Sequence, residues 1–208
     1  MTGCVPRTQE RSEMIYKLAM YDVYPVTFLS PCDGKTLRVY DNWHRALQYA
    51  VNTNGDVLLF EDDGIVKPHL KQSIELAKQL QQPTYFYINE VLQDGTDENK
   101  NLYPNDIWQK IKSGAKLPLQ AVKLRNVSKV NSALALYLPR KYLVAFLSQY
   151  KQGNFDSQLC RWLDRNDIDT YTVIPHAVQH IHGKSYWNGN VTRSKSASAD
   201  LIPLDAAH

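Results

Sequence analysis

Three consecutive acidic residues, Glu61, Asp62 and Asp63, are the part of the sequence best suited to chemistry. They directly follow an apolar run at residues 56–60 (DVLLF), which is typical of a buried parallel strand. Adjacent carboxylates repel one another unless a cation is present, and Mg²⁺ or Mn²⁺ binds carboxylate and phosphate oxygens together. In an extended backbone Glu61 and Asp63 point to one side and Asp62 to the other, and Gly64 then lets the chain turn. The pattern predicts a metal site, with a solvated acidic turn as the alternative.

Three histidines within seven residues form a second cluster, at His176, His180 and His182. In an extended segment all three fall on the same side, and imidazole is a common nitrogen ligand of ions such as Mn²⁺. Lys184 follows closely and could neutralise a leaving diphosphate. The cluster predicts a nitrogen ligand for the same cation, with histidines that only cap a strand end as the alternative.

The elements that must position these residues alternate along the first half of the chain. Strands are expected at residues 2–5, 24–29, 56–60 and 84–88, and helices at 8–20, 42–51 and 68–80. The second half is mixed, with a loop at 89–104, helices at 105–112, 139–150 and 155–165, and strands at 119–124, 133–138 and 169–174. Such alternation predicts an α/β fold with a largely parallel central sheet and helices on both faces. Ligands of such sheets bind beyond the carboxyl ends of the strands, where the acidic residues stand.

Composition sets the remaining limits. A chain of 208 residues that is 43% hydrophobic is long enough for one domain, expected at residues 1–190, followed by a flexible polar tail at 191–208. No apolar run is long enough to span a membrane, and the first residues lack the apolar core of a signal peptide. Cys4, Cys32 and Cys160 match no zinc or disulfide pattern, which favours a cytoplasmic location. The net charge of +3 permits a polyanionic partner without requiring one.

The run LLFEDDG, preceded by a helix with the sequence NWHRALQYA, resembles glycosyltransferases of the GT-A fold. Their acidic motif has the form DxD or EDD and ends a strand. The likeness covers roughly residues 4–189 and is strongest to small single-domain members from phages and from lipopolysaccharide-type biosynthesis. It implies a GT-A-like three-layer α/β/α fold. It also implies transfer of a sugar from a nucleotide sugar, UDP-linked in the first instance, to an acceptor hydroxyl with Mn²⁺ or Mg²⁺ as cofactor.

The resemblance also implies roles for single residues near the first strands. Asp63 would ligate the metal, Asp62 would contact the donor sugar or ribose and take part in catalysis, and Glu61 would support both. The loop after the first strand would bring Arg7 to a phosphate or the base. The end of the second strand would bring Asp33 to the ribose or the base, where a carboxylate can accept a hydrogen bond.

Two further roles fall in the second half of the chain. In many inverting members an acid at the start of a late helix is the general base, and Asp156 stands at that position. An aspartate there is also an ordinary helix N-cap, so both interpretations stay open. Related transferases complete the metal shell with a histidine near the C-terminus, for which His180 is preferred and His182 is second.

The acceptor follows least directly from the sequence. One candidate is a hydroxymethylated pyrimidine in double-stranded phage DNA, because the stretch 184–193 (KSYWNGNVTR) is basic and aromatic. Basic side chains would follow the phosphates, and Tyr186 or Trp187 could stack on an extruded base. A glycan or lipopolysaccharide acceptor is the alternative. Two functions of other classes also stay open: a metal-dependent nuclease or phosphoesterase, and a non-catalytic module that binds DNA or glycans.

Overall fold

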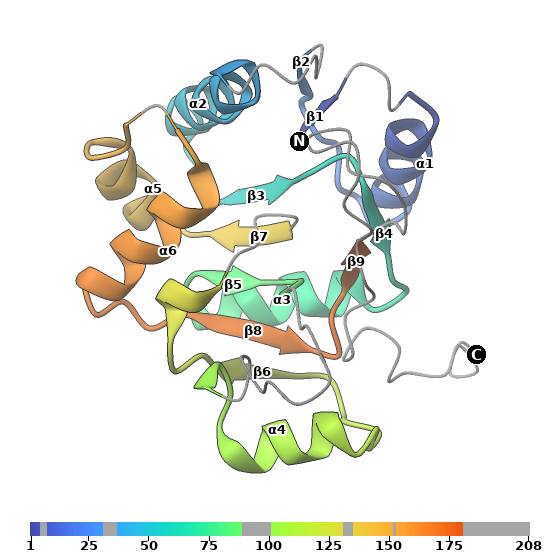
Figure 1. Cartoon of the computed structure of the whole chain (residues 1–208). Helices are drawn as coiled ribbons and strands as arrows, with labels where there is room; N and C mark the ends of the chain where they lie inside the picture. The colour runs from blue at the N-terminus through green and yellow to red at the C-terminus, as the bar shows by residue number, and fades with distance from the viewer. Residues whose placement is uncertain (5–7, 31–36, 89–100, 131–134, 152, 181–208) are drawn as a thin grey trace.

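The computed structural model describes residues 1–4, 8–30, 37–88, 101–130, 135–151 and 153–180 (Figure 1). Its strands are β1 (Thr2–Cys4), β2 (Phe28–Ser30), β3 (Val57–Phe60), β4 (Gly64–Val66), β5 (Thr84–Tyr85), β6 (Gln120–Lys123), β7 (Ala135–Leu138), β8 (Tyr171–Ile174) and β9 (Val178–His180). Its helices are α1 (Thr8–Ala19), α2 (Leu37–Val51), α3 (Leu70–Leu80), α4 (Asn105–Lys112), α5 (Arg140–Leu147) and α6 (Phe155–Arg165). The tail expected at residues 191–208 lies outside the described residues.

The central sheet has five strands in the order β3-β7-β5-β8-β6. Only β5 and β8 run parallel, whereas β7 is antiparallel to β3 and β5, and β6 is antiparallel to β8. β1 and β2 form a separate parallel pair beyond β3 (Figure 1). An isolated parallel bridge between Thr2 and Glu61 connects this pair to the end of β3.

The α/β class is confirmed, but the expectation of a largely parallel sheet is wrong. Apolar patterning identifies a strand without giving its direction. The chain enters β7 from the end of the sheet opposite to that at which β3 and β5 begin, so the strand runs against both of its neighbours. The central sheet is therefore mixed, with β5 and β8 as its one parallel pair among the described residues, and the separate pair of β1 with β2 is also parallel.

Several element boundaries also differ from the expectation. α2 begins at Leu37, before the expected start at residue 42, β2 begins only at Phe28, and β5 is limited to two residues. The short strands β4 and β9 were not predicted as strands. Most of the loop expected at 89–104 lies outside the described residues. Within the described ranges, no helix combines the length and the apolarity that a membrane crossing requires.

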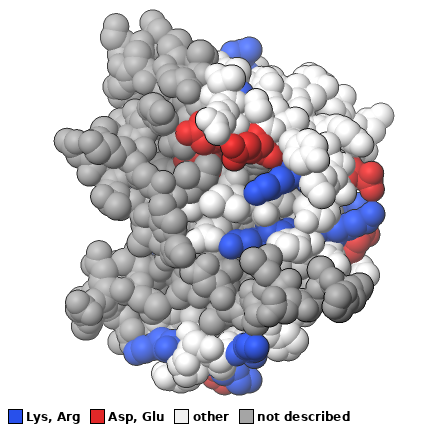
Figure 2. Space-filling view, turned by 90° about the vertical axis from the view of Figure 1, so that its right-hand side faces the viewer, with Lys and Arg blue, Asp and Glu red and all other residues white. Residues whose placement is uncertain are grey.

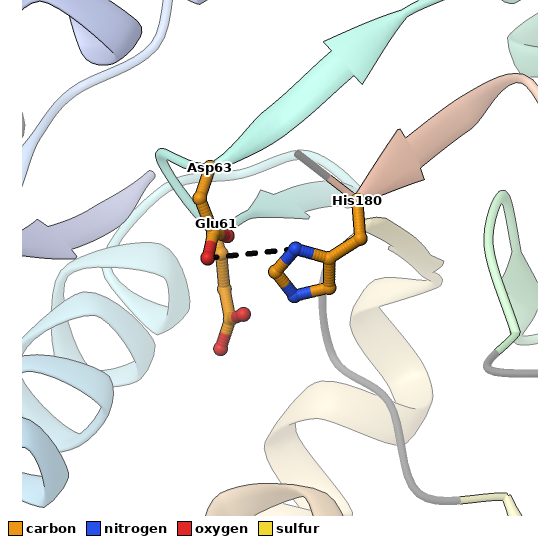
Figure 3. A group of neighbouring side chains, drawn as sticks. All are labelled: Glu61, Asp63 and His180. Atoms are coloured by element: carbon orange, nitrogen blue, oxygen red, sulfur yellow. Dashed lines mark ion pairs between the residues drawn. The ribbon is translucent and has the colours of Figure 1, made fainter. Parts of the chain in front are cut away.

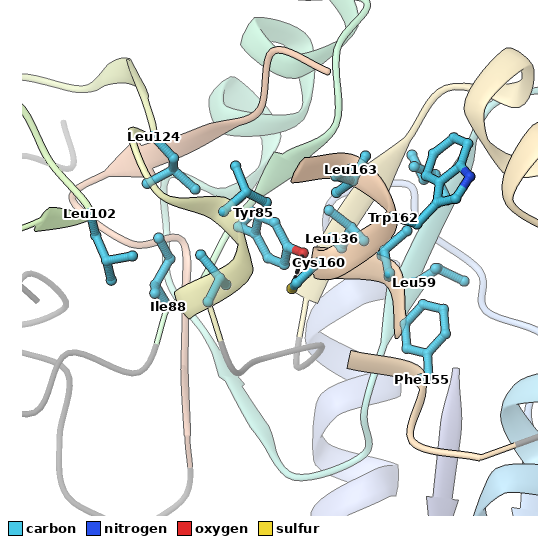
Figure 4. Close-up of a cluster of buried hydrophobic side chains, with 14 of the residues drawn as sticks. Leu59, Tyr85, Ile88, Leu102, Leu124, Leu136, Phe155, Cys160, Trp162 and Leu163 are labelled. Atoms are coloured by element: carbon cyan, nitrogen blue, oxygen red, sulfur yellow. Dashed lines mark hydrogen bonds between the residues drawn. The ribbon is translucent and has the colours of Figure 1, made fainter. Parts of the chain in front are cut away.

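Two apolar cores lie on opposite faces of the sheet, because neighbouring residues of a strand point to opposite sides. Leu59 and Leu136 contribute to the core beneath α2, α4, α5 and α6, of which Figure 4 shows a part. Phe60 and Tyr137 contribute to the other core, which α1 and α3 cover. The sheet is thus held between helices on both faces, and the acidic motif leaves it where β3 ends.

An N-cap residue and packing contacts with neighbouring elements fix the position of α6. Asn154 is its N-cap and accepts a hydrogen bond from the Ser157 backbone N–H at 3.0 Å. The Phe155 ring stacks on Trp43 of α2 with 4.3 Å between the ring centroids. Further along, Cys160 Sγ lies 3.2 Å from the Tyr85 hydroxyl (Figure 4). Burial raises the pKa of Cys160 to about 12, so the group is a structural thiol.

Candidate metal centre

Glu61, Asp63 and His180 converge although His180 lies far from the other two in the sequence (Figure 3). One potential ligand atom from each residue lies within 4.8 Å of the other two. His180 Nδ1 is 3.6 Å from Asp63 Oδ2. The side chains of Asp63 and His180 are only 7% and 11% exposed, and Glu61 is half-buried. Two acids and an imidazole thus lie together at a largely buried position.

Strand pairing brings the histidine to the acids. The chain turns directly after β3 and re-emerges as β4, which pairs antiparallel with β9. The register places Gly64 opposite His180, so the histidine stands beside the turn that carries Glu61 and Asp63. The site therefore depends on two three-residue strands.

Close packing explains the glycine that follows the acids. A Cβ atom on Gly64 would lie 2.8 Å from Val178 Cγ1 and 3.1 Å from Met14 Cε, closer than such atoms normally approach. The chain turns at residues 62–63, directly before Gly64, and the φ of Gly64 is not positive, so backbone conformation does not by itself require glycine at this position. The residue is glycine because α1 and β9 approach the β4 backbone at this point.

Hydrogen bonds fix the segment that leads into β9. The Lys67 N–H donates to the Ala177 carbonyl at 2.9 Å, and the Val178 N–H donates to the Phe86 carbonyl at 3.2 Å. His69 Nε2 donates to the Pro175 carbonyl at 3.0 Å. Desolvation lowers the pKa of His69, which favours the neutral ring in this contact. His180 therefore follows a segment, residues 175–178, that hydrogen bonds hold in place.

Asp62 is not part of this cluster and binds α1. Its carboxylate forms an ion pair with Arg11 at 3.2 Å, with side chains that are 5% and 12% exposed. Its backbone N–H donates to the Thr2 carbonyl at 3.0 Å. The expected division, with Glu61 and Asp63 on one side and Asp62 on the other, is thus found, although the backbone turns here. The predicted contact of Asp62 with a donor sugar stays a prediction.

The chemistry of the donor set fits a divalent cation such as Mn²⁺ or Mg²⁺. Carboxylate oxygens are the ligands that both ions prefer, and an imidazole nitrogen suits Mn²⁺ better than Mg²⁺. Three protein ligands would leave coordination positions for phosphate oxygens and water. Among the described residues, no other group of histidine, cysteine, aspartate and glutamate converges in this way.

His176, the other described histidine of the predicted histidine cluster, does not join Glu61, Asp63 and His180. His176 is fully buried, and its ring packs edge-on against Tyr87 with 5.7 Å between the centroids. The His180 ring packs edge-on against the same Tyr87 ring, with 5.9 Å between the centroids, so the two histidines share this neighbour, and of the two only His180 joins the cluster. Arg7, Asp33, His182 and Lys184 lie outside the described residues, as do Tyr186 and Trp187.

Asp156 lies in the first turn of α6, half-buried and outside the cluster. Asn154 is the N-cap, so the alternative interpretation of Asp156 as the cap is wrong. The charge of Asp156 adds to desolvation in raising the pKa of Tyr85 and Cys160. Its role as a general base stays a prediction.

Sequence reasoning missed Arg11, although a signal for it was present. Arg11 stands three residues before Met14 and seven before Leu18, so it shares the helix face that these buried residues define. A cation on an apolar stripe is seldom buried without a partner. That partner is Asp62, with which Arg11 forms an ion pair.

Figure 2 shows the face of the molecule on the side of α1, β4 and β9. In its described part, acidic side chains form one compact patch, and basic side chains lie near it among uncharged residues. No protein-family model matches the chain, and no curated protein matches it.

Proposed function

We propose that the chain is a metal-dependent glycosyltransferase that moves a sugar from a nucleotide sugar, UDP-linked in the first instance, to an acceptor hydroxyl. The observation that carries the proposal is the convergence of Glu61, Asp63 and His180 at the carboxyl end of β3. An α/β sheet binds ligands at this end of its strands. The likeness of the EDD motif to GT-A transferases supports the choice of reaction.

The residues divide into those that hold the cation and those that place them. Asp63, Glu61 and His180 would bind Mn²⁺ or Mg²⁺, with His182 as the second histidine candidate. A bound cation would stabilise the charge on the leaving diphosphate. Arg11 fixes the acidic turn through Asp62.

The remaining roles concern substrates. Arg7, Asp33 and Lys184 are proposed to contact the nucleotide and its phosphates, and Asp62 to contact the donor where the ion pair with Arg11 allows. Asp156 is proposed to take the proton of the acceptor hydroxyl. The proposed acceptor is a hydroxymethylated pyrimidine in double-stranded DNA, with a glycan or lipopolysaccharide as the alternative.

The test is donor turnover with a matched pair of variants. Nucleoside diphosphate release is measured with UDP-glucose and UDP-galactose, in Mn²⁺ or EDTA, with hydroxymethylated duplex DNA, unmodified duplex DNA or a glycan as acceptor. We expect release that requires Mn²⁺ and one acceptor. Asp63→Asn should abolish it, and Glu75→Gln, an exposed change on α3, should leave it intact.

Two outcomes would contradict the proposal. Cleavage of a phosphodiester without any sugar donor would replace the transferase with a metal-dependent nuclease or phosphoesterase. Tight binding of DNA or glycan without turnover, unchanged in Asp63→Asn, would indicate a non-catalytic binding module.

A further inference from the structure

Tyr87 packs against both histidines that lie before and within β9. It follows β5 by two residues, belongs to the core that α1 and α3 cover, and is only 2% exposed. The centroid of its ring lies 5.7 Å from that of His176 and 5.9 Å from that of His180. The interplanar angles are 61° and 79°, so both contacts have the edge-on geometry that aromatic rings favour. One buried ring thus contacts a core histidine and a candidate metal ligand.

The orientation of the His180 ring decides whether this residue can act as a ligand. Rotation of a histidine ring about its bond to Cβ is only weakly restricted, because the torsion has broad wells. His180 Nδ1 lies 3.6 Å from Asp63 Oδ2, which is longer than a hydrogen bond, so this ion pair alone defines the ring orientation loosely. Figure 3 shows both ring nitrogens on the side that faces the acids. A packing contact on the ring would help to keep them there.

Hydrogen bonds hold the backbone beside Tyr87. The Phe86 N–H donates to the carbonyl of Ala135, the first residue of β7, at 2.9 Å. The Phe86 carbonyl accepts from the N–H of Val178, the first residue of β9, at 3.2 Å. The second bond joins the segment that carries Tyr87 directly to the strand that carries His180. The two rings therefore meet between segments that are bonded to each other.

His176 supports the Tyr87 ring from the core. Its side chain is fully buried, and the carbonyl of the preceding residue, Pro175, accepts a hydrogen bond from His69 at 3.0 Å. A side chain in a close-packed core has little room to change its rotamer. The contact with His176 therefore limits the movement of the ring against which His180 packs.

We propose that Tyr87 is a positioning residue of the candidate metal centre, whose ring keeps the His180 imidazole turned toward Glu61 and Asp63. The inference rests on the metal centre of the proposed function and adds to it a residue that supplies no ligand atom. Neighbours that orient a metal-binding histidine strengthen metal binding, and loss of such a neighbour typically weakens it by about tenfold or more. The role requires an aromatic ring at position 87 and does not require its hydroxyl group.

The test compares substitutions that keep the ring with substitutions that remove it, in the full chain with Mn²⁺ as the probe. Affinity is measured from the free-ion signal in electron paramagnetic resonance, and imidazole coordination from the nitrogen coupling of the bound ion in pulsed measurements. Tyr87→Phe should match the parent in both. Tyr87→Leu should weaken binding by about tenfold and reduce the nitrogen coupling, because the imidazole no longer keeps its orientation.

Tyr85→Leu is the matched control. Tyr85 is also a buried tyrosine, but it belongs to the other core, where its hydroxyl lies 3.2 Å from Cys160 Sγ. This change should lower stability and leave the affinity and the nitrogen coupling as in the parent. If Tyr87→Leu does not fold, Tyr87→Met takes its place with the same expected result, because the flexible methionine side chain fills a core gap without a ring.

Each contrary outcome identifies a different failure. Affinity and nitrogen coupling like those of the parent in a folded variant without the ring would overturn the role of Tyr87 and leave the metal centre standing. Equal weakening in Tyr87→Phe would overturn the ring contact as the cause. Equal weakening in Tyr85→Leu would replace positioning with a general effect of core packing. Absence of Mn²⁺ binding in the folded parent would overturn both the metal centre and this inference.

Discussion

The two ends of β3 carry acids in opposite situations. Before the strand, the carboxylate of Asp56 accepts hydrogen bonds from the Tyr137 hydroxyl, the Arg140 backbone N–H and the Gln81 side-chain amide. Burial alone would raise the pKa of Asp56, but these donors outweigh it and hold the pKa below its ordinary value. The acid is therefore a structural anchor between strand and helix.

After the strand, Glu61 and Asp63 are brought toward each other and toward His180. Glu61 is half-buried and Asp63 is buried, and bringing two such carboxylates together costs free energy that a bound cation would recover. The comparison teaches that sequence position alone does not separate a structural acid from a functional one. What distinguishes the acids after β3 is that the fold assembles them with another potential metal ligand, His180.

Of the changes at the two ends of β3, the loss of Asp63 should have the largest effect on ligand binding. In the parent protein, UDP with Mn²⁺ at about 100 times the dissociation constant should add about 2.7 kcal/mol of stability, a shift of a few degrees in Tm. Asp63→Asn should abolish this shift, because it removes a ligand of the candidate metal centre. Thermal unfolding with and without EDTA measures it, and an unchanged shift in the variant would contradict the assignment.

A methyl group at Gly64, near the same end of β3, should lower both stability and Mn²⁺ affinity by disturbing the packing. Gly64→Ala would force Val178 and Met14 apart and move β9, so we expect a loss of about 1–3 kcal/mol in the free energy of unfolding. Affinity for Mn²⁺ should fall as well, since β9 carries His180. Denaturant unfolding and a Mn²⁺ titration check both effects. Gly55→Ala, where a Cβ meets no atom within 4 Å, is the control for adding a methyl group.

Asp56→Ala should lower stability without changing the affinity for Mn²⁺. Loss of its hydrogen bonds should cost about 1–2 kcal/mol, while the affinity for Mn²⁺ stays that of the parent. The pKa of Asp56 is depressed in the folded state, so its contribution is complete above the unfolded pKa of about 3.9 and is lost as the pH falls through the folded pKa. Unfolding measured from pH 7 downward should therefore show the difference between parent and variant shrinking below the unfolded pKa. A difference that does not shrink with falling pH would contradict this role.

The ion pair of Arg11 with Asp62 should give the smallest effect. Arg11→Met leaves Asp62 without this partner and loosens the turn, so we expect a fall of roughly threefold to tenfold in affinity for Mn²⁺, a range typical of residues that orient metal ligands. Arg11→Lys should recover part of the loss. Equal affinities for all three proteins would show that the ion pair contributes only to folding.

Much of the fold was predictable from local patterning. α4 and α6 have the expected bounds, because each combines a regular apolar stripe with a clear start. β3 was found one residue short, since a run of apolar residues marks a buried strand. Strand direction was not predictable, and it decides whether the sheet is parallel or mixed.

The candidate site was predictable only in part. Glu61 and Asp63 were singled out from residue type and spacing, and His180 was preferred among three histidines because of the resemblance to GT-A transferases; the structure brings the three together. β4 and β9 were missed because three residues are too few to show a period, yet their register places His180. His176 lies against the same Tyr87 ring as His180 but is not part of the cluster.

Direct binding of Mn²⁺ tests the central claim, measured as the loss of the free-ion signal in electron paramagnetic resonance. The parent should bind Mn²⁺ at this centre, and Glu61→Gln, Asp63→Asn and His180→Gln should each weaken that binding by about tenfold or more. Asp56→Asn, the matched change at the opposite end of β3, should bind as the parent does. Absence of binding in the folded parent, or equal binding in all four variants, would contradict the assignment of a metal centre to Glu61, Asp63 and His180.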